Sequence, residues 1–169
     1  PNGFRTQLYS PNGRYLKDID VADAIQAQLA EVGIIADIVT MEWATYLQTT
    51  ELPPEENPAP MMLIGWGTVT GDADYGLYPL FHTSQWVPTG SNRAFYSNPA
   101  VDELLELART NPNPSVRRAT YREAMAMIMQ DAPWLFLHAE VQLTAIRDEV
   151  EGVVVHPTER VMAHKARFK

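Results

Sequence analysis

The chain has 169 residues, no cysteine and a formal net charge of −8 at pH 7. This length is enough for one domain with its own hydrophobic core. The absence of cysteine excludes disulfides, thiolate metal sites and cysteine nucleophiles. The acidic balance argues against a nucleic-acid partner, and no stretch approaches the apolar length that spans a bilayer. We therefore expect a globular domain that does not bind nucleic acid.

The first fifty residues alternate between strand and helix patterns. Residues 3–10 and 34–41 have the alternating or β-branched composition of strands. Residues 19–32 place apolar side chains at helical spacing, and residues 42–50 fit a second, shorter helix. A strand–helix–strand–helix order predicts parallel strands covered by helices, and hence an α/β fold.

The middle of the chain combines short apolar runs with polar loops. Residues 51–60 contain four prolines and three acids, which indicates a surface loop. Residues 61–66 fit a short buried strand, and residues 73–81 offer one helical turn before Pro79 interrupts it. Residues 82–98 show little periodicity, which predicts a long loop of the functional or mobile kind.

The remainder of the chain predicts two helices and then strands. Residues 98–110 form an amphipathic helix with Asn98 as its N-cap. Residues 115–132 form a second one, which Ser115 would cap. The apolar runs that follow predict three strands, over residues 134–140, 141–146 and 151–157.

Asp72 and Asp74 lie just beyond the apolar run of residues 61–66. They could form a general acid/base pair, oxygen ligands of a hard cation, or the cap of the next helical turn. The cation loop lacks the further acids that calcium would need, which favours capping or hydrogen bonding in a cleft. The sequence has no histidine pair at zinc-ligand spacing and no hydrolase nucleophile motif. We therefore expect no metal, no cofactor and no catalytic residue.

Trp66 stands between Gly65 and Gly67 at the end of the same apolar run. It fits either core packing at a strand end or an aromatic wall at the carboxyl edge of a sheet, where open α/β folds bind ligands. The flanking glycines favour the second interpretation, because they allow a ligand to approach the backbone closely. Further aromatic residues follow in the next thirty positions: Tyr75, Tyr78, Phe81, Trp86, Phe95 and Tyr96.

Four segments carry a family resemblance: NGRYLKDIDVADAIQAQLAEVGIIADIVTMEWATYLQ, LIGWGTVTGDADYGLYPLF, FYSNPAVDELLELAR and YREAMAMIMQDAPWLFLH. Over roughly residues 3–157 the sequence resembles the C-terminal lobe of extracytoplasmic solute-binding proteins of ABC importers. The class is family 5, which covers peptides, nickel and glutathione. The resemblance implies an α/β lobe of the type II periplasmic-binding-protein fold, a mixed sheet flanked by helices. Residues 1–169 would form a single domain, a fragment of a longer two-lobed chain.

The resemblance implies a substrate-binding component rather than an enzyme. Such a protein binds a peptide-like solute (an oligopeptide, a dipeptide or glutathione) in a cleft between two lobes and delivers it to a membrane permease. Its partners would be the solute, the permease subunits and the missing N-terminal lobe of the same chain, and its location periplasmic or extracytoplasmic. In dipeptide-type relatives an aspartate shortly after Gly-Trp binds the ligand's amino group, whereas Val69 stands at that position here. The pattern is closer to glutathione-binding relatives.

The resemblance and the residues together suggest a ligand edge from Gly65 to Asp74. Trp66 would pack on the solute, and backbone groups of Gly67 and Thr68 would hydrogen-bond it. Asp72 and Asp74 would hold the loop or meet a cationic group, and Arg93 would bind a ligand carboxylate. The expected ligand-binding set is therefore Gly65, Trp66, Gly67, Thr68, Asp72, Asp74 and Arg93. The alternatives are a small hydrolase that uses Asp72 and Asp74, and a protein-interaction module that docks through the aromatic loop.

Overall fold

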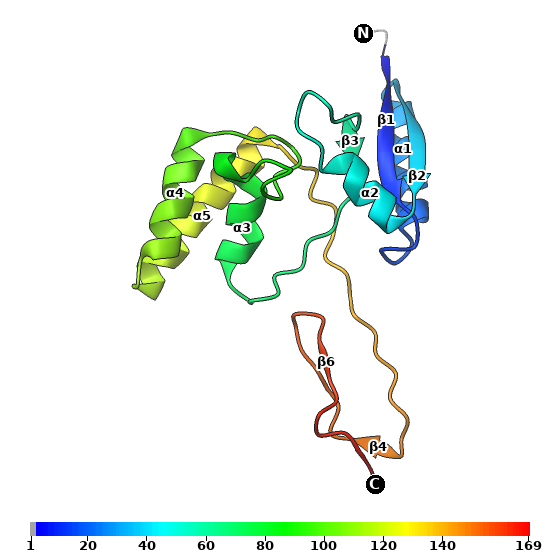
Figure 1. Ribbon diagram of the computed structural model, residues 1–169, viewed down its shortest axis with the longest axis vertical. Helices are drawn as coiled ribbons and strands as arrows, with labels where there is room; N and C mark the ends of the chain where they lie inside the picture. Colours follow the sequence, from blue (N-terminus) through cyan, green and yellow to red (C-terminus); the bar gives the residue numbers. More distant parts are fainter. Residues whose placement is uncertain (1–2) are drawn as a thin grey trace. The chain divides into compact units, whose positions relative to one another are not determined.

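The computed structural model describes residues 3–169, which divide into two compact units (Figure 1). The first unit comprises the chain up to Trp66 together with Ser84–Phe95. The second comprises Gly67–Thr83 together with Tyr96–Lys169. The expectation of a single lobe over the whole chain stays a prediction, and each unit is described below in turn.

The first unit is built on a parallel three-stranded sheet. Strand β1 (Phe4–Pro11) lies between β2 (Ile34–Met41) and β3 (Met61–Met62). Helix α1 (Asp18–Glu31) connects β1 to β2, and α2 (Trp43–Thr50) follows β2. Because such crossovers are right-handed and these two run in opposite directions across the sheet, the helices cover opposite faces. The predicted strand–helix–strand–helix order is confirmed.

The core of this unit lies between the sheet and α1. Leu8 of β1, Ala22 of α1 and Ala36 of β2 are buried together. Ile25 and Leu29 of α1 pack against them at helical spacing. The small side chains of the two alanines allow the helix to lie close to the strands. The longer side chains of Ile25 and Leu29 then fill the space around this close contact.

Strand β3 is shorter than the predicted strand over residues 61–66. Only Met61–Met62 pair with β1, and the Leu63 amide adds one more hydrogen bond to the Tyr9 carbonyl at 2.8 Å. The Leu63 carbonyl instead accepts from the Tyr46 hydroxyl of α2 at 2.7 Å. The prediction was wrong here because apolar character continues to Ile64, while the next hydrogen bond of the ladder would need an amide from Pro11, which proline lacks.

The loop of residues 82–98 is irregular, as predicted, but much of it is compact. A 3₁₀ turn over Thr83–Gln85 starts it. Within the first unit, Asn92 is fully buried, and its backbone N–H donates to the Gln85 backbone carbonyl at 2.7 Å. A Cβ at Gly90 would lie 2.2 Å from that same carbonyl oxygen, so only glycine fits. Backbone hydrogen bonds hold this loop without regular secondary structure.

Three helices form the packed part of the second unit: α3 (Ala73–Phe81), α4 (Pro99–Thr110) and α5 (Pro114–Asp131). A short connection makes α4 and α5 antiparallel neighbours, as Figure 1 shows. Their contact buries an apolar stripe from each helix, namely Val101, Leu105 and Ala108 from α4 and Tyr121, Ala124 and Ile128 from α5.

The helix boundaries confirm one predicted cap and correct two other expectations. Asn98 caps α4 through a 3.1 Å bond from the Ala100 amide, and its amide nitrogen also donates to Asp131 at 2.7 Å. Helix α5 begins one residue earlier than predicted, because Asn113 rather than Ser115 is its cap. Helix α3 runs through Pro79 instead of stopping before it. In so short a helix, proline removes few backbone hydrogen bonds.

Residues after α5 contain short antiparallel pairs. Strand β4 (Val150–Glu151) pairs with β7 (Arg167–Phe168), and β5 (Val154–Val155) pairs with β6 (Val161–Met162). The predicted strands over 134–140 and 141–146 are wrong. Neither range forms a β-ladder with another described segment, and both are largely exposed. The predicted strand over 151–157 survives only as pieces of β4 and β5. Apolar content indicates burial, but a strand also requires a neighbouring strand to complete its hydrogen bonds.

The helical pair offers a matched test of this core. Leu105 is fully buried, whereas Leu107 on the same helix is half exposed. We expect Leu105→Ala to lower the free energy of unfolding by about 2–5 kcal/mol, because it leaves a cavity. Leu107→Ala should change it by less than about 1 kcal/mol. Urea denaturation followed by circular dichroism measures both, and equal effects would contradict the packing described.

Candidate functional site

Several aromatic side chains of the first unit follow the carboxyl ends of its three parallel strands. Arg14 and Tyr15 follow β1, Trp43 follows β2, and Gly65 and Trp66 follow β3. This edge of an open α/β sheet is where ligands bind in such folds, since the chain leaves neighbouring strands toward opposite faces there and opens a crevice. The carboxyl edge is therefore the candidate site of this unit.

Three aromatic rings and one guanidinium are stacked at this edge. Tyr15 meets Trp43 edge-to-face with ring centroids 5.9 Å apart, and Trp43 stacks on Tyr46 at 5.5 Å. The Arg14 guanidinium lies 5.1 Å from the Tyr15 ring centre and 5.0 Å from that of Trp43. Cation–π attraction at these distances orients Arg14 while its side chain stays exposed. The edge thus offers an apolar wall beside a positive charge.

Gly65 lies directly against this stack. Its carbonyl accepts a hydrogen bond from the Tyr15 hydroxyl at 3.3 Å. A Cβ at this position would lie 2.8 Å from Tyr15 Cε1, closer than side chains normally approach. The glycine is therefore explained by the Tyr15 ring that fills the space of its side chain, a contact that the sequence alone did not indicate.

Trp66 is half-buried and follows Gly65 at the end of the first unit. It is not enclosed in the hydrophobic core, so the core-packing interpretation does not describe it. Its position after β3, at the carboxyl edge, agrees with the expected aromatic wall. Contact between Trp66 and a solute stays a prediction.

Arg93 is almost fully buried, with 6% of its surface exposed. Its guanidinium forms an ion pair with Glu51, which ends α2, and donates to the Ser91 carbonyl at 3.4 Å. The ion pair fastens the loop of residues 84–95 to the end of α2. The predicted contact with a ligand carboxylate stays a prediction, and Arg14 is the exposed arginine at the edge.

Gly67 and Thr68 begin the second unit and are exposed. The Gly67 carbonyl accepts from the Val69 amide at 3.0 Å, and the Thr68 carbonyl accepts from the Gly71 amide at 2.8 Å. Turns within the loop thus use both carbonyls. A ligand that binds this backbone would take the N–H groups, which suit an anionic or carbonyl oxygen.

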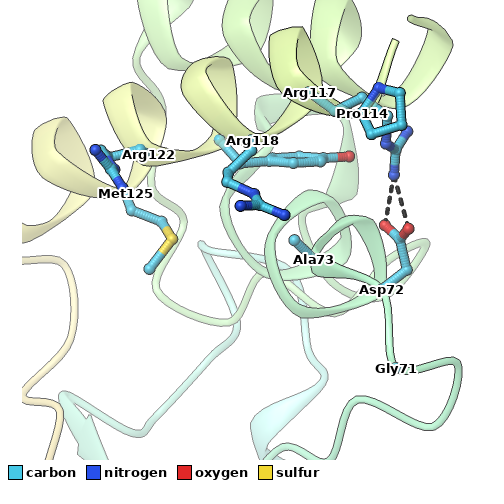
Figure 2. Close-up of a pocket in the computed structure, with 9 residues that line it drawn as sticks. Gly71, Asp72, Ala73, Pro114, Arg117, Arg118, Arg122 and Met125 are labelled. Atoms are coloured by element: carbon cyan, nitrogen blue, oxygen red, sulfur yellow. Dashed lines mark hydrogen bonds and ion pairs between the residues drawn. The ribbon is translucent and has the colours of Figure 1, made fainter. Parts of the chain in front are cut away.

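Asp72 and Asp74 are each engaged by different partners. Asp72 caps α3 through the Asp74 amide at 2.9 Å, and Arg117 Nη2 donates to both of its carboxylate oxygens at 2.7 and 2.8 Å (Figure 2). Asp74 lies 3.4 Å from Arg109 Nε and accepts from the Tyr121 hydroxyl at 3.5 Å. Burial raises the pKa of Tyr121 to about 12, and the Asp74 charge adds to the shift. Of the interpretations left open, this geometry supports capping.

The described residues also offer no metal or membrane-spanning feature of the following kinds. Residues 3–169 contain no cluster of three histidine or acidic side chains arranged to hold a metal ion. Among the helices that the structure describes, none has the length and apolar character needed to cross a membrane.

The sequence-based reasoning missed Arg14, Tyr15 and Trp43. A usable signal was present, because each follows a predicted strand by two to five residues and therefore belongs to the same sheet edge as Trp66. What the sequence could not show was that the rings stack on one another.

Comparison with known proteins identifies the family. The family model described as bacterial extracellular solute-binding proteins, family 5 Middle, matches residues 1–88, just over half of the chain. The glutathione-binding protein GsiB of Pectobacterium atrosepticum is 35% identical over 158 residues, which cover 93% of this chain and 30% of GsiB. The chain therefore belongs to the family 5 extracellular solute-binding proteins. It spans about 30% of the length of that curated relative.

Solved structures agree with this assignment. The chain is 28% identical to the clavulanic acid biosynthesis oligopeptide binding protein 2, with a TM-score of 0.81 over 94% of this chain and 29% of that one. It is 35% identical to the periplasmic binding protein DppA of Helicobacter pylori in complex with the peptide STSA, with a TM-score of 0.68 over 79% of this chain and 25% of that one. The expected periplasmic-binding-protein-like α/β fold and the family resemblance are both confirmed.

The Gly65–Tyr15 contact can be tested directly. We expect Gly65→Ala to lower the free energy of unfolding by about 1–3 kcal/mol, because the new methyl group displaces the Tyr15 ring. Gly67→Ala is the matched control, since its Cβ would meet nothing closer than 3.6 Å. Thermal denaturation of both variants measures the difference. A Gly65→Ala protein as stable as the control would show that Tyr15 does not occupy this space.

Proposed function

We propose that this chain is one lobe of the substrate-binding component of an ABC importer, and that its carboxyl edge binds a peptide-like solute. The observation that carries the proposal is the stack of Arg14, Tyr15 and Trp43 beside Gly65 and Trp66 at the carboxyl ends of a parallel sheet. Family membership supports it, because relatives of this chain are named for binding glutathione or oligopeptides.

The chemistry of the edge suits a small peptide. Aromatic rings pack against aliphatic or planar amide groups and exclude water from them. An exposed guanidinium beside them grips a carboxylate bidentately, and every free peptide and glutathione carries at least one carboxylate. The ring contacts hold the Arg14 head group over the site, which reduces the entropy lost when a ligand binds.

The hydrolase alternative receives no support from this geometry. Each of Asp72 and Asp74 has its own arginine partner, and Asp72 is also committed to the cap of α3. Both carboxylates are thus engaged by side chains and backbone of their own unit rather than presented together to a substrate. The lobe is therefore proposed to bind without turnover.

The proposed setting follows from the family. The solute would be held between this lobe and a second lobe from the rest of the longer protein, and the closed form would deliver it to the permease subunits in the membrane. The family description places its members outside the cytoplasm, which fits a periplasmic or extracytoplasmic protein.

Substitutions in the full-length protein test the site. We expect Trp66→Ala to weaken binding of glutathione or a tripeptide by about 2 kcal/mol, roughly thirtyfold, because an aromatic anchor is lost. Arg14→Ala should weaken binding of solutes with a free carboxylate more than that of their amidated forms. Arg5→Ala is the control, since this exposed arginine stands near the start of β1 and pairs with Asp37. Isothermal titration calorimetry measures all three, and unchanged affinity in both site variants would refute the proposed edge.

The isolated lobe should bind weakly. Half of the proposed cleft is absent from residues 1–169, so a bound solute would keep much of its surface in water. We expect millimolar or undetectable affinity for peptides and glutathione in calorimetry with this chain alone. Micromolar binding would show that the second lobe contributes little and that the two-lobed model is wrong.

A further inference from the structure

The outer face of α5 carries a stripe of two arginines followed by two methionines. Arg118, Arg122, Met125 and Met129 are spaced four, three and four residues apart, which places them along one side of the helix. All four are exposed, and the two methionines have 50% and 58% of their surface in solvent. We call these four residues the α5 stripe.

A groove of about 570 Å³ lies beside the first half of the stripe. Figure 2 shows Arg118 reaching from α5 toward Ala73, where α3 begins, with Arg122 and Met125 further along the same helix. Tyr121 and Gly71 also line the groove. The arginines therefore stand at the wall of a concave surface, not on a fully convex helix face.

The groove carries more positive charge than its acidic residue neutralises. Arg117 is neutralised by Asp72, whereas Arg118 and Arg122 form no ion pair among the described residues 3–169. They repel each other at four-residue spacing, and Arg118 also lies near the positive end of the α5 dipole. The rest of the chain is acidic, with a net charge of −8. An arrangement that costs helix stability is explained if an anionic group binds there.

The methionines indicate which kind of anion. Methionine and arginine are enriched in protein–protein interfaces, and flexible methionine side chains adapt to the surface that covers them. Binding to an anionic bilayer gains only about 1 kcal/mol for each basic residue near the surface. Two unpaired arginines on a strongly acidic chain are too few for that. A protein segment with carboxylates next to apolar side chains complements both halves of the stripe.

We propose that the α5 stripe and its groove dock an acidic protein segment, and that in the importer this segment belongs to the extracytoplasmic face of the permease. The proposal rests on the proposed function for the identity of the partner. The carboxylates would pair with Arg118 and Arg122, and the neighbouring apolar residues would cover Met125 and Met129. Docking would therefore use residues of the second unit, whereas the proposed solute edge belongs to the first unit.

The test uses the full-length protein and its permease reconstituted in nanodiscs of zwitterionic lipid. We expect Arg118→Glu with Arg122→Glu to weaken docking at least tenfold, and Met125→Ser with Met129→Ser to weaken it at least threefold. The matched control is Arg147→Glu with Arg160→Glu, two exposed arginines that change the net charge equally. Biolayer interferometry measures docking, circular dichroism checks folding, and calorimetry measures solute affinity, which should not change in any variant.

The outcomes separate the two proposals. If no solute binds to the wild-type protein, the proposed function fails, whatever the docking result. If solute binds normally and the stripe variants dock like the wild type, the docking surface alone is overturned. Equal losses in the stripe and control variants would indicate a general charge effect and would also overturn it. Binding to anionic vesicles in place of the permease would overturn the protein partner in favour of lipid.

Discussion

The hydrogen bond from the buried Tyr46 hydroxyl to the Leu63 carbonyl holds the chain at the point where the third strand stops. It fixes α2 to the chain that leaves β3, whose last hydrogen bond to β1 is made by the Leu63 amide, two residues before Gly65. Burial raises the pKa of Tyr46 far above its usual value, so the hydroxyl keeps its proton and remains a donor. Pro11 of β1 has no amide to donate at the next position of the ladder, so the Tyr46 hydroxyl takes the Leu63 carbonyl instead, and the chain leaves the sheet toward Gly65 and Trp66 at the carboxyl edge.

From that point the chain serves two purposes in a short stretch. Gly65 and Trp66 complete the aromatic edge of the first unit, and the next residues begin the second unit and lead to the Asp72 cap of α3. The first group brings aromatic rings and an exposed arginine to the proposed ligand edge. The second group is held by ion pairs within its own unit, which accounts for two acids that otherwise resemble a catalytic pair.

The sequence predicted what depends on local chemistry. Asn98 followed by proline marked the start of α4, and the alternation of the first fifty residues gave the parallel order. It failed where the outcome depends on distant partners. The apolar residues 134–146 pair with no strand among residues 3–169, and Arg14 meets Trp43 only after the sheet has formed. The ion pair of Arg93 with Glu51, a residue distant in sequence and close in space, was not foreseen either, and the ligand contacts expected of Trp66 and Arg93 stay predictions.

Asn98 shows how narrow the choice of side chain can become at one position. Aspartate, serine and asparagine usually replace one another at the start of a helix, since each supplies an oxygen acceptor. Here the oxygen serves the Ala100 amide while the nitrogen donates to Asp131 at the far end of the neighbouring helix. Aspartate would set two carboxylates against each other, and serine is too short to serve both. Asn98 therefore looks like an interchangeable cap when α4 is considered alone, but it is specific to the contact between α4 and α5. Homologous sequences should keep asparagine at this position wherever they keep the acid at position 131.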